Sequence, residues 1–89
     1  MAEVKITIVN QLGLHARAAG KFVSLASSFR SQIEIVRGVE VVDGKSILGV
    51  LGLAAPRGTE LRLVARGPDE EQALAALSDL VSQRFGEER

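Results

Sequence analysis

Apolar and polar residues alternate along three stretches of the chain, which is typical of β-strands with one buried face. These stretches are residues 3–9, 32–37 and 60–66, and a shorter strand is predicted over residues 39–42, across a turn at Gly38. The positions predicted to face inward are Val4, Ile6 and Ile8, then Ile33 and Ile35, then Leu61, Leu63 and Ala65. The strands predicted over residues 32–37 and 39–42 form a predicted hairpin.

The spacing of apolar residues changes to three- and four-residue steps in two other stretches, which predicts amphipathic helices over residues 16–29 and 70–85. Residues 47–55 are also apolar, but their glycines weaken a helix, so only a short one is predicted there. The predicted core faces consist of Ala19, Phe22, Val23, Ala26 and Phe29 in the first helix, and of Ala73, Leu74, Leu77, Leu80, Val81 and Phe85 in the last.

The ends of the last helix also have sequence signals. Asp69 is a good N-cap residue, and Gln72 follows three residues later, at the spacing of a capping box. Residues 86–89 are polar apart from Gly86, and we expect them to fray.

The predicted order of elements is β-α-β-β-α-β-α, without a linker or repeat, over one domain that spans residues 1–89. This order implies an α+β fold of two layers, with the helices on one face of a mostly antiparallel sheet. The pattern alone does not distinguish a ferredoxin-like strand order from other βαββαβ arrangements.

Composition excludes several classes of function. Eleven basic and eleven acidic residues give a formal net charge of zero, which argues against a nucleic-acid-binding protein. The chain has no cysteine and one histidine, so we expect neither disulfides nor a metal site. No apolar run is long enough to cross a membrane, and the first residues do not resemble a signal peptide, so we expect a cytoplasmic protein without membrane insertion.

The single histidine, His15, directly precedes the first predicted helix. The N–H groups of the first helical turn, in residues 16–18, have no partner within the helix, and the helix dipole is positive there. This end of a helix is a ready site for an anion, and Arg17 adds a cation. The same field favours the neutral, nucleophilic imidazole. His15 is therefore placed both to accept a phosphoryl group and to hold it.

Other interpretations of His15 remain open at this point. Most isolated histidines are surface or packed residues without chemistry, and an exposed Arg17 needs no special role. A regulatory domain could use His15 and Arg17 to bind a small anion without a covalent step. An enzyme that uses His15 as a general acid or base would require a pocket of converging groups, and the sequence offers only Arg17 nearby.

Two motifs point further. GLHARAA at residues 13–19, followed by DGKSILGVLGLAA at residues 43–55, resembles the HPr family, the histidine-containing phosphocarriers of the phosphoenolpyruvate-dependent phosphotransferase system. The resemblance extends over essentially the whole chain. It implies an open-faced β-sandwich, in which three helices cover one face of a four-stranded antiparallel sheet. It also implies that the protein is a phosphocarrier and not an enzyme, and that it needs no cofactor.

In the HPr family, the matching histidine receives a phosphoryl group from phosphorylated Enzyme I on ring nitrogen Nδ1 and passes it to a histidine of an enzyme IIA domain. The resemblance therefore implies this role for His15, with Arg17 attending the phosphate. The resemblance also implies that Enzyme I and enzyme IIA domains are its partners. It implies a monomeric bacterial protein that is linked to sugar transport.

The second motif adds a regulatory residue and a docking surface. Ser46 is first of all a candidate N-cap for the short helix, and the resemblance implies that it is also a target of an HPr kinase/phosphorylase. The residues that the resemblance places at a docking surface for the partners are Ile47, Leu48 and Leu51, with Lys21 and Lys45 at its rim.

Two positions depart from the usual family pattern. Ala18 stands where the family usually has proline, and Gly52 stands where many members have serine. Alanine restores one backbone N–H near His15, since proline has none. These departures raise two alternatives within the family, a nitrogen-related branch carrier or a purely regulatory copy.

Overall fold

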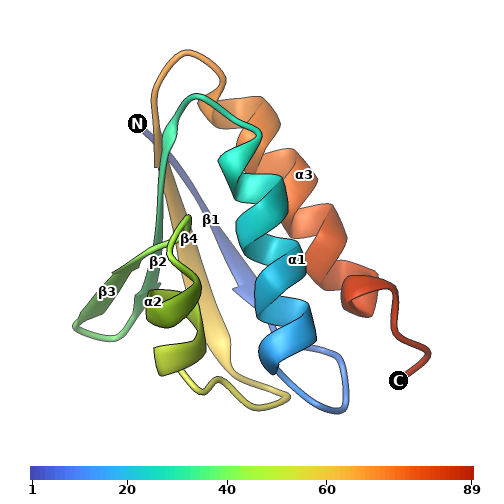
Figure 1. Cartoon of the computed structure of the whole chain (residues 1–89). Helices are drawn as coiled ribbons and strands as arrows, with labels where there is room; N and C mark the ends of the chain where they lie inside the picture. The colour runs from blue at the N-terminus through green and yellow to red at the C-terminus, as the bar shows by residue number, and fades with distance from the viewer.

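The structure is a computed structural model that describes all residues from Met1 to Arg89. Figure 1 shows a sheet with helices packed on one side of it. In chain order, the elements are β1 (Ala2–Thr7), α1 (Ala16–Ser27), β2 (Gln32–Arg37), β3 (Glu40–Asp43), α2 (Ile47–Gly52), β4 (Glu60–Arg66) and α3 (Glu70–Ser82), followed by a short 3₁₀ turn, η1 (Arg84–Gly86). The predicted order β-α-β-β-α-β-α is confirmed.

The four strands form one antiparallel sheet in the order β1-β4-β2-β3. Ile6 lies opposite Leu61, and Ile35 lies opposite Leu63, so the predicted inward positions of three strands share one face. The helices cover that face (Figure 1). Arg62 lies between Leu61 and Leu63 along β4 and is exposed, so it lies on the uncovered face. The fold is therefore the expected open-faced sandwich, with β3 beginning one residue later than predicted because Val39 lies in the turn.

The core lies between the sheet and the two long helices. Most of the predicted helical positions are buried, among them Phe22 in α1 and Leu77 in α3, and Ala18 is fully buried as well. Burying a side chain the size of leucine or phenylalanine contributes roughly 1.5–3 kcal/mol. Because α1 and α3 share this layer, the N-terminal end of α1 lies near the C-terminal end of α3 (Figure 1).

The predicted capping box at α3 is wrong. Asp69 is the N-cap residue, but its side chain caps no N–H of α3. Instead its carboxylate accepts hydrogen bonds from the backbone N–H groups of Arg30 and Ser31, both at 2.9 Å, and from the Ser31 hydroxyl at 2.5 Å. These bonds hold the pKa of Asp69 at about 2, below its ordinary value of 3.8. The carboxylate therefore ties the loop after α1 to the start of α3.

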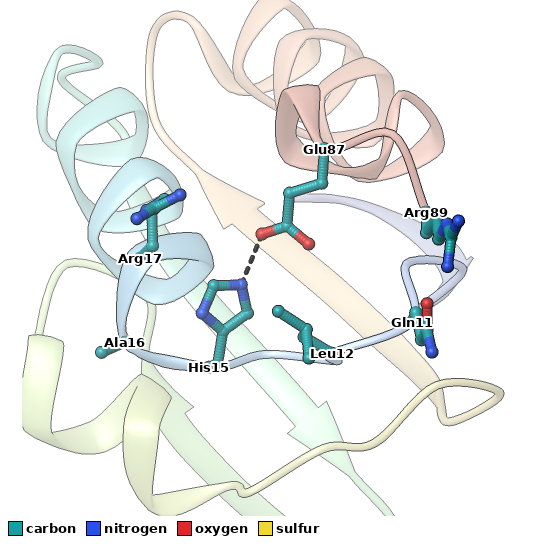
Figure 2. A pocket seen from close by; sticks show the side chains of 7 residues that line it. All are labelled: Gln11, Leu12, His15, Ala16, Arg17, Glu87 and Arg89. Carbon is teal, nitrogen blue, oxygen red and sulfur yellow. Dashed lines mark hydrogen bonds and ion pairs between the residues drawn. The ribbon is translucent and has the colours of Figure 1, made fainter.

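The predicted fraying of residues 86–89 is wrong for Gly86 and Glu87, whose backbone N–H groups donate to the carbonyl oxygens of Gln83 and Arg84. α3 ends at Ser82, and the next turn contains Arg84 and Phe85 with φ angles of 58° and 55°. This left-handed region costs a non-glycine residue roughly 1–2 kcal/mol. Phe85 is nevertheless fully buried in the core, which offsets the strain. After this turn the Glu87 side chain points toward His15, whereas Arg89 lies nearer Gln11, in the loop before α1 (Figure 2).

The Asp69 tether generates a prediction about stability and pH. The pKa of Asp69 is lower in the folded protein than in the unfolded chain, so ionised Asp69 stabilises the fold above about pH 4, and this contribution is lost as the pH falls toward 2. We expect Asp69→Asn to lower the free energy of unfolding at pH 7, and the difference from wild type to shrink between pH 4 and pH 2. Urea unfolding over this pH range measures it.

Glu71→Gln is the matched control, because Glu71 is an exposed acid in the same first turn of α3. It removes the same charge from the helix end without touching Ser31. If the difference in the free energy of unfolding between wild type and Asp69→Asn stays constant from pH 7 to pH 2, the ionised carboxylate is not what stabilises this contact.

Candidate functional site

His15 lies at the point where α1 begins. It is the N-cap residue, with extended backbone angles of φ −77° and ψ 179°. Its carbonyl oxygen accepts the first helical hydrogen bond, from the N–H of Ala19 at 2.8 Å. Its side chain makes no capping hydrogen bond and is thus available for other contacts. The predicted start of the helix at Ala16 is confirmed.

The backbone N–H groups of Ala16, Arg17 and Ala18 make no backbone hydrogen bond. They lie at the positive end of a twelve-residue helix, whose peptide dipoles add up to attract an anion. Ala18 supplies the third of these groups, which a proline at this position would lack. Ala16 and Arg17 are exposed, so their N–H groups are the free donors beside the imidazole, whereas Ala18 is fully buried.

Glu87 is the feature that the sequence did not reveal. One oxygen of its carboxylate contacts Nε2 of His15, and the other accepts a hydrogen bond from Nδ2 of Asn10 at 3.0 Å. Figure 2 shows the Glu87 side chain reaching down to one ring nitrogen, while the other, Nδ1, is turned away from it toward the start of α1. Nδ1 is thus the ring nitrogen without a protein partner.

Opposing effects act on the pKa of Glu87. Burial raises it, whereas the hydrogen bonds from Asn10 and His15, the charge of a protonated His15 and the charge of Lys21 lower it. The lowering effects win, so the pKa of the Glu87 carboxyl lies below its ordinary value. Glu87 is therefore ionised at neutral pH and acts only as a hydrogen-bond acceptor.

The C-terminal turn holds Glu87 in place. Nζ of Lys21 donates a hydrogen bond of 2.6 Å to the carbonyl oxygen of Phe85, and the Phe85 ring is fully buried. The only sequence signal for this turn was Phe85 itself, an apolar residue at the end of the helical pattern, followed by Gly86. Glu87 and His15 are 72 residues apart, and no local sequence pattern predicts their contact.

These groups line an open pocket of about 600 Å³. Besides the charged groups, its walls include Gln11 and the exposed side chain of Leu12. Arg17 and Arg89 bring two positively charged side chains to the pocket, against one acidic side chain, that of Glu87. The His15 side chain is 27% exposed, so the ring is open to a reactant and is not a packed core residue.

Ser46 and the apolar residues after it lie at α2, which packs beside α1 (Figure 1). Oγ of Ser46 accepts a hydrogen bond from the N–H of Gly49 at 3.2 Å, so the predicted N-cap is confirmed. Ile47 and Leu48 are 40% and 80% exposed, whereas Leu51 is half-buried and packs against the core. Of the predicted apolar docking residues, two are thus on the surface and one is mainly structural.

The two lysines predicted at the rim both have intramolecular partners. Lys21 binds the carbonyl oxygen of Phe85, as described above. Nζ of Lys45 donates to the carbonyl oxygen of Phe29 at 2.8 Å, in the loop that follows α1. Each therefore has a structural role that the sequence did not indicate.

The structure contains no group of three or more His, Cys, Asp or Glu side chains placed to hold a metal ion. None of its helices is both long enough and apolar enough to span a lipid bilayer.

Comparisons with known proteins agree on one family. The family model described as "PTS HPr component phosphorylation site" matches residues 2–83. The phosphocarrier protein HPr of Pseudomonas aeruginosa is 50% identical over 88 residues, which is 98% of each chain.

Solved structures give the same result. HPr-C-His from Thermoanaerobacter tengcongensis is similar over the whole of both chains, with a TM-score of 0.96 and 47% identity. An HPr dimer from the same organism has a TM-score of 0.79 at 47% identity, over 98% of this chain and 100% of that one. The chain therefore belongs to the HPr family: it is a phosphocarrier protein of the phosphotransferase system rather than a catalytic enzyme.

Proposed function

We propose that His15 accepts a phosphoryl group on Nδ1 from phosphorylated Enzyme I and passes it to a histidine of an enzyme IIA domain. The observation that supports this most directly is the position of Nδ1, which has no protein partner and lies beside the unpaired N–H groups of the first turn of α1. In the transfer, the Nδ1 lone pair forms the new P–N bond while the bond between phosphorus and the donor breaks.

The charges of the pocket support the same proposal. A phosphoryl group on Nδ1 is a dianion at the positive end of α1, and Arg17 is exposed and takes part in no ion pair of the structure. Helix ends contribute roughly 0.3–1 kcal/mol to a nearby charge, and hydrogen bonds to charged groups roughly 1.5–3 kcal/mol. These contributions are modest, which suits a carrier that must release the group again.

We also propose that the exposed side chains of Leu12, Ile47 and Leu48 form the apolar docking patch for both partners. Leu12 lines the pocket of His15, and Ile47 and Leu48 begin the neighbouring helix α2. Lys21 and Lys45 contribute positive charge from fixed positions, since both are held by carbonyl oxygens. We propose a cytoplasmic carrier that acts as a monomer, because a single chain already brings His15, the N–H groups at the start of α1 and Arg17 together.

The proposed phosphocarrier function predicts that His15→Ala abolishes phosphorylation of the protein by Enzyme I. The wild-type protein, incubated with phosphoenolpyruvate and Enzyme I, should gain the mass of one phosphoryl group that is stable at neutral pH and lost in acid. The variant should gain none, because it lacks the accepting nitrogen. Intact-mass measurement at both pH values tests this. A wild-type protein that binds small anions but never gains the mass would instead favour the non-covalent regulatory domain.

Arg17→Ala is expected to slow phosphoryl transfer from Enzyme I about tenfold, since the loss of one charged contact worth about 1.4 kcal/mol in the transition state corresponds to that factor. Stopped-flow or quench measurements of the labelling rate report it. Arg62→Ala is the matched control, because Arg62 lies on the uncovered face of the sheet and should leave the rate unchanged. Equal rates for both variants would remove Arg17 from the mechanism.

We further propose that phosphorylation of Ser46 regulates the carrier by placing negative charge beside the docking patch. Ser46→Ala should lower the free energy of unfolding by about 1 kcal/mol through loss of the cap. Ser46→Asp should keep the cap and the stability but slow transfer from Enzyme I. Chemical denaturation and labelling rates separate the two effects.

Gln32→Glu, which adds a negative charge on the uncovered face of the sheet, is the control for charge alone. If Gln32→Glu slows phosphoryl transfer from Enzyme I as much as Ser46→Asp does, negative charge at position 46 has no specific regulatory role.

A further inference from the structure

The contact between Glu87 and His15 fixes where the ring proton sits. A neutral imidazole carries one proton, on either Nδ1 or Nε2. The ionised carboxylate of Glu87 only accepts hydrogen bonds, and it contacts Nε2. The proton therefore sits on Nε2, and the lone pair is on Nδ1, the nitrogen that faces the first turn of α1 (Figure 2).

Phosphorylation changes what Nε2 needs. When Nδ1 carries a phosphoryl group, a ring that keeps its Nε2 proton is a cation, and a neutral ring has a bare lone pair at Nε2. The bare lone pair would face the carboxylate of Glu87, which is repulsive, whereas the protonated ring donates a charge-assisted hydrogen bond to it. The position of Glu87 thus favours the cationic phosphoimidazole ring.

We propose that Glu87 is a positioning residue that keeps the proton on Nε2 of His15 before, during and after phosphoryl transfer. This inference rests on the proposed function of His15. When Nδ1 attacks, the P–N bond forms, the donor's bond to phosphorus breaks, and the ring becomes a cation whose charge is balanced by the carboxylate. On release the P–N bond breaks, its electron pair returns to Nδ1, and the ring is neutral again. No proton leaves Nε2 in either direction.

The C-terminal turn is built to keep Glu87 at this place. Burial of Phe85 and its hydrogen bond from Lys21 hold a turn that is strained at two residues, and Asn10 binds the second carboxylate oxygen. The Glu87 side chain is 15% exposed, so water screens its charge only partly.

The other charges at the pocket act against the cationic ring. Arg17 of α1 and Arg89 of the C-terminal segment line the pocket, and the charge of Lys21, also in α1, acts on Glu87. These cations suit the phosphate but disfavour a proton on the ring. Glu87 is the one acidic side chain among the residues that line the pocket, and it opposes them.

The test measures the proton directly. Full-length protein with ¹⁵N-labelled histidine is phosphorylated with phosphoenolpyruvate and Enzyme I, and the Nε2 resonance of the phosphorylated ring is followed against pH. Glu87→Gln keeps a neutral acceptor but removes the charge. We expect the pH at which Nε2 loses half of its proton to fall by about 0.5–1 unit in this variant, as for a partly exposed ion pair. Glu87→Ala should lower it at least as much.

Glu88→Gln is the matched control, because Glu88 is the exposed neighbour and should leave the titration unchanged. Backbone amide spectra of each variant show that the fold is intact. A phosphorylated Glu87→Gln protein that titrates like wild type overturns the role of Glu87 while leaving the carrier function in place. Absence of any phosphoryl group on His15 in the wild type overturns the proposed function instead.

Discussion

The close contact between the loop that precedes α1 and the loop that precedes β4 fixes where α1 begins, and the site depends on that point. The N–H of Leu14 donates to the carbonyl oxygen of Ala55 at 2.8 Å, and the Leu14 side chain is buried. Gly13 has a positive φ of 69°, and a Cβ there would lie 2.6 Å from the same carbonyl oxygen. Only glycine fits this contact, because both the backbone angle and the space exclude a side chain. With Leu14 anchored, His15 is left extended at the mouth of the helix.

The C-terminal turn supplies the second side of the site. It holds two non-glycine residues in the left-handed region, a local cost that the buried ring of Phe85 and the hydrogen bond from Lys21 offset. Because this turn packs against α1, it brings a residue near the end of the chain to one near its beginning. The imidazole therefore lies between a positive helix end and a negative side chain, each facing a different ring nitrogen.

The formal charge of zero hides this separation of charges. The pocket combines unpaired backbone donors and two arginines with one acidic side chain, so it attracts an anion toward Nδ1 while Nε2 stays in contact with Glu87. Neither effect is strong alone, because the pocket is open and water screens charges at its surface. A carrier needs such moderate interactions, since a phosphoryl group that is held too tightly would not be passed on.

The sequence by itself determined the order of the elements, the inward faces of the strands, and the place of His15 at the N-cap of α1. Periodicity and caps are local properties, so they can be predicted from neighbouring residues. Only the tertiary structure decided that Asp69 binds Ser31 instead of its own helix, that Lys21 and Lys45 bind carbonyl oxygens, and that Glu87 contacts His15. These contacts join residues distant in the chain, and a polar side chain that finds its partner through packing carries no mark of it in the residues beside it.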